Sequence, residues 1–98
     1  MFAPPFNVSA VQLGPTTVRF KFLDAQSKES GYEIQRSVNG GAFSTIGIVS
    51  TSGAGSGNLF FDDINVLFGM QLTYRGRAIG RNPSGPSAWS TSNTVVVH

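Results

Sequence analysis

The sequence has no cysteine, a single histidine and few charged residues, which make up 12% of the chain against roughly 25% in a typical soluble domain. Without cysteine, neither a disulfide framework nor a cysteine-ligated zinc site is available. No apolar run approaches the roughly 20 residues that span a bilayer. The N-terminal residues lack the basic start and long apolar stretch of a secretory signal. No signal peptide is seen, either because one was removed or because the protein is made without one, and we expect no insertion into a membrane.

Charge of either sign is not concentrated anywhere. Seven Lys and Arg residues stand against five Asp and Glu residues, so the formal net charge is +2 and the pI is about 9.5. Nucleic-acid binding depends on basic residues that neutralise several phosphates together, and no such cluster occurs in the sequence. Nucleic acid is therefore not an expected partner.

The residues that are present favour strands and turns. Glycine is abundant, and Ser, Thr, Val and Phe are common, as in proteins built from short strands. Val18, Phe20 and Phe22 alternate with Arg19 and Lys21, which predicts a strand with an inward apolar row and an outward basic row.

Six further strands follow from the same alternation. Three of them are predicted near residues 6–13, 43–49 and 59–64, and the other three include residues 32–35, 72–78 and 95–97. In the first of these, Val8, Ala10 and Leu13 are expected to point inward. Asn39-Gly40 marks a tight hairpin turn, because both residue types tolerate positive φ. The sequence therefore predicts one all-β domain over residues 1–98, with residues 1–5 as an extended N-terminal arm.

The order of turns and strands near the C-terminus carries a family resemblance. Residues 67–78 read as a turn feeding a strand, and residues 80–90 as a Gly/Pro-rich loop before a Ser-x-x-Ser strand. This order resembles the last third of a fibronectin type III domain, in a bacterial or phage-like variant. Tyr32 matches the start of the family's third strand, and Phe22 stands at its tryptophan position. The resemblance implies a seven-stranded antiparallel immunoglobulin-like β-sandwich of fibronectin type III type.

Two positions depart from the family pattern. Leu72 stands where the family has its corner tyrosine, so the hydrogen bond of that hydroxyl cannot form there. Gly76 replaces a common valine, and we expect Trp89 to turn inward and fill the missing volume. The expected aromatic core consists of Phe20, Phe22, Tyr32, Ile34, Tyr74 and Trp89.

The candidates for catalysis and metal binding are few. His98 is the last residue, where chains usually fray, and this argues against a general base. Asp62 and Asp63 are adjacent in a strand and should point to opposite faces, so a solvated strand end is favoured over a weak calcium site with Asn58. The glycine-rich residues 53–57 lack the helix and lysine of a phosphate-binding loop. We expect no catalytic residue, no metal ligand, no cofactor and no enzymatic activity.

Basic side chains on one strand form the first candidate partner contact. Arg75 and Arg77 are expected on the outer face of the sixth strand, beside Glu33 on the third. Cross-strand ion pairing is the favoured explanation, and attraction of an anionic partner is the alternative.

The loops supply the second set of contacts. Segments 24–30, 51–57 and 80–87 are expected at the same end of the sandwich as the N-terminal arm. The candidate contacts there are Phe2, Arg81, Asn82 and Pro83, since loops on a rigid scaffold often bind partners and Arg and aromatic residues dominate interface energies. The alternative is that these loops are only connections.

Two functional hypotheses remain. The leading one is a small accessory component of a virus or phage particle, as a decoration or tail protein that docks on capsid or tail proteins at the virion surface. The alternative is a spacer or weak glycan-binding module of a bacterial carbohydrate-active enzyme or surface adhesin, in an extracellular setting. In that case an exposed Trp89 beside Tyr74 would stack on a sugar.

Overall fold

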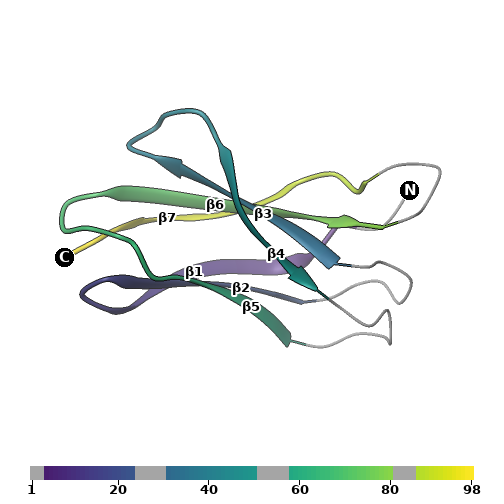
Figure 1. Cartoon of the computed structure of the whole chain (residues 1–98), viewed down its shortest axis with the longest axis horizontal. Coiled ribbons are helices and arrows are strands. Elements are labelled where there is room, and N and C mark those ends of the chain that lie inside the picture. The colour runs from purple at the N-terminus through teal and green to yellow at the C-terminus, as the bar shows by residue number, and fades with distance from the viewer. Residues whose placement is uncertain (1–3, 24–30, 51–57, 81–85) are drawn as a thin grey trace.

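Two antiparallel sheets lie face to face in the computed structural model, which describes residues 4–23, 31–50, 58–80 and 86–98 (Figure 1). The strands are β1 (Phe6–Gly14), β2 (Thr17–Leu23), β3 (Gly31–Val38), β4 (Ser44–Ser50), β5 (Asn58–Asp63), β6 (Gln71–Ile79) and β7 (Ser90–Val96). The strand order is β1-β2-β5 in one sheet and β4-β3-β6-β7 in the other. The predicted seven-stranded antiparallel sandwich is confirmed. β4 and β5 are shifted by one residue from their predicted bounds, and β1 ends one residue later than predicted.

The core forms where the apolar rows of the two sheets meet. Phe20 and Phe22 of β2 pack their rings 5.4 Å apart, and Phe22 lies 4.9 Å from the ring of Tyr32 on β3. Tyr74 of β6 stacks on Phe20 with 6.0 Å between ring centroids. Burying side chains of this size is the main stabilising contribution to such a fold. The predicted inward rows of β2, β3 and β6 are therefore confirmed.

Trp89 is not part of this core, contrary to the prediction. Its ring is half-buried on the outer face of the β4-β3-β6-β7 sheet, against the side chains of β6. Gly76 leaves no vacancy for it to fill, because a Cβ at that position would lie 3.2 Å from the ring of Phe20 and 3.3 Å from Cδ1 of Ile34. Large side chains from both sheets already occupy the space above the glycine.

Leu13 was also predicted inward and is 52% exposed. Successive residues of a strand point to opposite faces, so Leu13, three residues beyond the buried Ala10, falls on the outward side. The predicted hairpin turn is confirmed, since Asn39 and Gly40 adopt φ values of 53° and 76°.

One side of the sandwich is closed by contacts between β1 and β7. The amide of Asn93 accepts a hydrogen bond from Ala10 N at 2.9 Å and donates one to Ala10 O at 3.1 Å. His98 is expected to fray, yet its backbone N–H donates to Gln12 Oε1 and its carbonyl accepts from Gln12 Nε2. These contacts hold the final residue against β1, at the end of the molecule marked C (Figure 1).

Candidate binding surfaces

The outer face of β6 carries a ladder of alternating cations and rings. The guanidinium carbon of Arg75 lies 4.1 Å from the ring centroid of Phe43 and 4.3 Å from that of Trp89. Arg77 lies 4.4 Å from the same indole. Side chains two residues apart on a strand point to the same face, so both guanidinium groups can make cation–π contacts with the one Trp89 ring.

Hydrogen bonds fix both arginines from the side of β3. Arg77 pairs with Glu33 at 2.8 Å, which confirms the predicted cross-strand ion pair. Arg75 donates instead to the neutral Gln35, also at 2.8 Å. Glu33 further accepts from the hydroxyl of Thr45 at 2.6 Å, and this bond together with Arg77 lowers the pKa of the Glu33 carboxyl.

This face is therefore occupied by contacts within the domain. The guanidinium groups of Arg75 and Arg77 both lie over the Trp89 ring, and Tyr74 is fully buried on the opposite side of the sheet. The arrangement of Trp89 beside Tyr74 that would stack on a sugar is not formed. The other predicted contacts, Phe2, Arg81, Asn82 and Pro83, lie outside the described residues.

Asp63 was predicted to lie at a solvated strand end, and this prediction is wrong. The residue is buried at the end of β5. Its Oδ2 accepts hydrogen bonds from Arg36 Nη1 at 2.7 Å and from the hydroxyl of Tyr74 at 2.8 Å. Burial, and next the hydrogen bond to Asp63, raise the pKa of Tyr74 well above its ordinary value.

The neighbouring Asp62 points outward as predicted and pairs with Arg19 at 2.7 Å. Its hydrogen bond with Arg19 lowers the pKa of the Asp62 carboxyl.

No group of three or more His, Cys, Asp or Glu side chains is arranged to hold a metal ion among the described residues. Within the same residues, no helix has the length and apolar character needed to cross a membrane.

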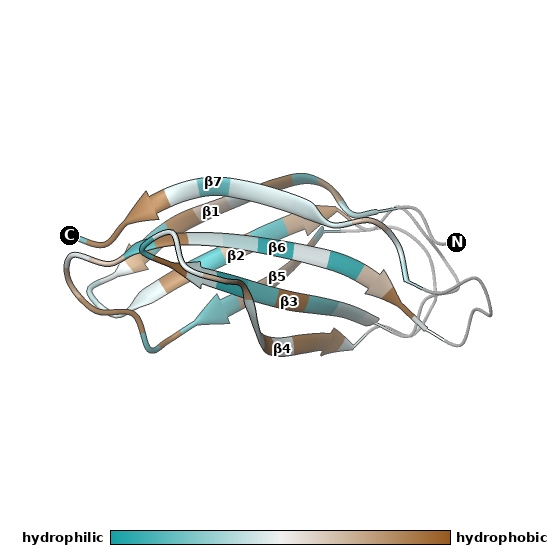
Figure 2. Cartoon of the chain, turned by 90° about the horizontal axis from the view of Figure 1, so that it is seen from above, coloured by the Kyte–Doolittle hydropathy of each residue, from teal (hydrophilic) through white to brown (hydrophobic). Residues whose placement is uncertain are grey.

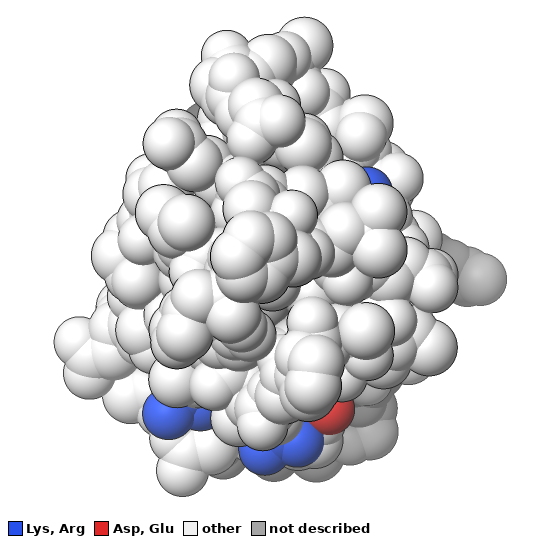
Figure 3. Space-filling model, turned by 90° about the vertical axis from the view of Figure 1, so that its left-hand side faces the viewer, with Lys and Arg blue, Asp and Glu red and all other residues white. Residues whose placement is uncertain are grey.

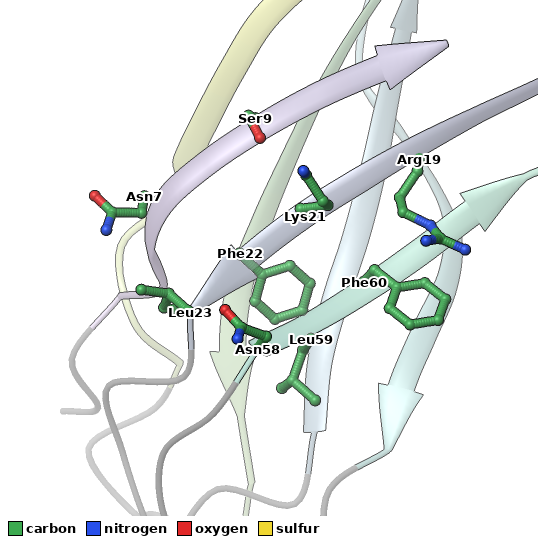
Figure 4. Close-up of a pocket in the computed structure, with 9 residues that line it drawn as sticks. All are labelled: Asn7, Ser9, Arg19, Lys21, Phe22, Leu23, Asn58, Leu59 and Phe60. Carbon is green, nitrogen blue, oxygen red and sulfur yellow. The ribbon is translucent and has the colours of Figure 1, made fainter. Parts of the chain in front are cut away.

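A pocket of about 390 Å³ lies on the outer face of the β1-β2-β5 sheet (Figure 4). Its polar lining comes from all three strands: Asn7 and Ser9 of β1, Arg19 and Lys21 of β2, and Asn58 of β5, with Phe60 at its border. The sequence reasoning missed this site. The outward positions of β2 were recognised, but the pairing of Lys21 with Ser9 depends on the register of β1 and β2, and its pairing with Phe60 on a strand far along the chain.

The end of the sandwich at the C-terminus presents a second surface that was not predicted. We call it the apolar end surface, and it consists of Leu13, Ile64, Leu67, Phe68 and Val96, each more than half exposed. Figure 2 shows the loop before β6 and the end of β7 coloured as hydrophobic. Figure 3, which faces this end, shows charged side chains only near its margin.

Backbone hydrogen bonds hold the segments of the apolar end surface together. Val66 N donates to Thr16 O, which ties the loop before β6 to the turn between β1 and β2. Gly69 N donates to Val97 O at 2.8 Å, which ties the same loop to the end of the chain. Gly69 adopts a φ of 88°, a conformation that glycine reaches without strain. Phe68 is thus 85% exposed on a loop with fixed geometry.

Comparison of the sequence with protein-family models and with curated proteins gives no match. Solved structures do resemble the fold. The twitchin kinase region from C. elegans (Fn31-NL-kin-CRD-Ig26) gives a TM-score of 0.74 at 18% identity, over 97% of this chain and 16% of that one. Titin domains A168–A170 give 0.73 at 15% identity, over 97% of this chain and 32% of that one. A myokine structure gives 0.66 at 16% identity, over 97% and 94% of the two chains.

These likenesses show an immunoglobulin-like or fibronectin type III-like sandwich. They show the fold alone, because the identities are low and this chain spans only 16% and 32% of the first two structures.

Proposed function

We propose that the domain is a non-enzymatic binding module that docks on a larger protein assembly through the apolar end surface. The observation that carries this proposal is Phe68, a large aromatic side chain that is 85% exposed among other apolar residues. Scattered apolar residues are ordinary on protein surfaces, but contiguous ones mark interaction sites.

The composition of the apolar end surface supports a protein partner. Interface centres are poor in charged residues and enriched in aromatic residues and Met, and a few buried aromatic anchors supply most of the binding energy. Phe68 has the character of such an anchor, with Leu67 beside it. Because Gly69 and Met70 hydrogen-bond the loop to the C-terminal segment and to Leu67, little conformational entropy is lost when a partner covers it.

The assembly that we propose is a virus or phage particle, with this domain as a decoration or tail component at the virion surface. Low charge and Ser, Thr and Gly-rich composition suit a domain that packs in many copies on a neighbour. The alternative, a spacer or weak glycan-binding module in an extracellular protein, loses Trp89 as a stacking platform, since arginines cover its ring.

Incorporation of variants into the native assembly tests this proposal. Phe68→Ser should remove the domain from purified particles, whereas Phe60→Ser, which changes a half-exposed Phe on another face, should not. Equal incorporation of both variants would refute docking through the apolar end surface. Incorporation into an assembly other than a virus particle would support docking and refute the virion hypothesis.

A further inference from the structure

We propose that the pocket on the outer face of the β1-β2-β5 sheet binds an acidic saccharide, a carbohydrate whose sugar units carry carboxylate groups. This inference does not depend on docking through the apolar end surface, since the two sites use different residues. It goes beyond a general affinity for glycans, because it assigns a site and a charge to the ligand.

The charge of the pocket favours an anion. Lys21 is exposed, and in the described part of the chain the ion pairs are made by Arg19, Arg36 and Arg77, so its ammonium group is not neutralised there. Of the residues that the structure describes, no Asp or Glu lines the pocket. The nearest acid across β5 is Asp62, which Arg19 engages through two hydrogen bonds of 2.7 and 3.0 Å. Among the described residues Lys21 therefore supplies an unpaired cation, and a charge-assisted hydrogen bond is the strongest kind that it can offer a carboxylate.

The neutral groups around Lys21 suit hydroxyl groups of a sugar. Ser9 is paired with Lys21 across β1 and β2, and Asn58 is paired with Leu23 across β2 and β5. Asn7 lies at the same end of the pocket as Asn58 (Figure 4). A side-chain amide both donates and accepts, as does a serine hydroxyl, so these groups can match the mixed donor and acceptor pattern of sugar hydroxyls.

Phe60 supplies the apolar part of the site. It is paired with Lys21 in the register of β2 and β5 and is 50% exposed. The guanidinium carbon of Arg19 lies 4.0 Å from its ring centroid, and the residue stays half-exposed with this contact in place. The C–H groups of a sugar ring can pack on such a surface. With a volume of about 390 Å³, the pocket falls within the range of roughly 300–1,000 Å³ seen for small-ligand sites.

An acidic peptide is the competing ligand. Protein interfaces are depleted in Lys and Ser and enriched in aromatic residues and Met. The lining contains the depleted types Ser9 and Lys21 together with the enriched types Arg19 and Phe60, whereas the apolar end surface consists of apolar side chains alone. The volume of the pocket and its polar groups favour a small polar ligand.

Titration of the isotope-labelled domain with oligogalacturonate, followed by amide chemical shifts in NMR, tests the proposal. We expect saturable shifts at Ser9, Lys21, Asn58 and Phe60, and much smaller shifts with a neutral malto-oligosaccharide of the same length. Lys21→Gln should weaken oligogalacturonate binding at least about tenfold, because it removes the charged hydrogen bond. Lys21→Arg should retain binding. Arg75→Gln, which removes the same charge from the opposite sheet, should leave it unchanged.

Three results would overturn the proposal. The first is the absence of shifts at millimolar oligogalacturonate. The second is equal binding of a hexaglutamate peptide, which would assign the pocket to acidic peptides. The third is equal weakening of oligogalacturonate binding by Lys21→Gln and Arg75→Gln, which would show that binding depends only on the net charge of the domain. None of them bears on docking through Phe68.

Discussion

The hydroxyl of Tyr74 donates a 2.8 Å hydrogen bond to Oδ2 of Asp63, and both residues are buried. Because Arg36 Nη1 donates to the same oxygen at 2.7 Å, the contact joins β6, β3 and the end of β5. The family pattern places a tyrosine at position 72, where this chain has leucine. A tyrosine two residues later, with a side-chain acceptor, links the two sheets in its place.

Tyr74→Phe should lower the free energy of unfolding by about 1.5–3 kcal/mol at neutral pH. The substitution removes a buried hydrogen bond to a charged acceptor, and Arg36 alone remains as the side-chain donor to Oδ2. Urea unfolding followed by fluorescence measures this difference. An unchanged midpoint would show that the contact adds no net stability.

The same variant should respond less to alkaline pH. The folded-state pKa of Tyr74 is raised, so its stabilising contribution is complete below the unfolded value of about 10 and is lost as pH rises above it. Above that pH the wild-type free energy of unfolding should fall more steeply than that of Tyr74→Phe, by about 1.4 kcal/mol per pH unit. Parallel pH profiles would contradict the raised pKa.

Phe22→Ala should cost about 3–5 kcal/mol of stability, since it empties a core site that is 2% exposed. Phe68→Ala makes the same chemical change at a site that is 85% exposed, and it should alter stability by less than about 0.5 kcal/mol. Thermal unfolding of the two variants compares them directly. A large loss for Phe68→Ala would mean that this side chain is structural.

Trp89→Ala should cost less than removal of a core aromatic. A double-mutant cycle with Arg75→Ala should give a coupling energy of about 0.5–2 kcal/mol, as expected for a guanidinium against an aromatic ring. Zero coupling would mean that the contact between Arg75 and Trp89 is not maintained in solution.

Asp62→Asn should make stability less sensitive to acid. The folded-state pKa of Asp62 is lowered by its hydrogen bond with Arg19, so the stabilisation is present above the unfolded value of about 3.9 and is lost as pH falls through the folded pKa. Unfolding curves recorded between neutral and acidic pH should decline more gently for the variant. A decline of equal slope would count against this ion pair.

The sandwich was predictable because β2 and β6, which lie inside the two sheets, alternate without interruption. Phe20 and Phe22 of β2, Tyr32 of β3 and Tyr74 of β6 obey a period of two, and all are buried. The turn at Asn39 followed from local backbone preference. Each of these features depends on neighbours in sequence.

Contacts between distant segments were not predictable in the same way. Asp63 looks like a solvated strand end until Arg36 of β3 and Tyr74 of β6 are placed beside it. Trp89 looks like a core residue until Phe20 and Ile34 are seen to fill the space above Gly76. The two proposed binding surfaces likewise arise from strand register and from loops that meet only in the folded chain.

Site-specific photo-crosslinking in the cells that make the protein tests docking through the apolar end surface most directly. Phe68→p-benzoylphenylalanine should give one discrete adduct with a protein of the native assembly, and Phe60→p-benzoylphenylalanine, on the face of the proposed saccharide pocket, should give none. An adduct of equal yield from both positions, or no adduct from position 68 in the intact assembly, would contradict the account.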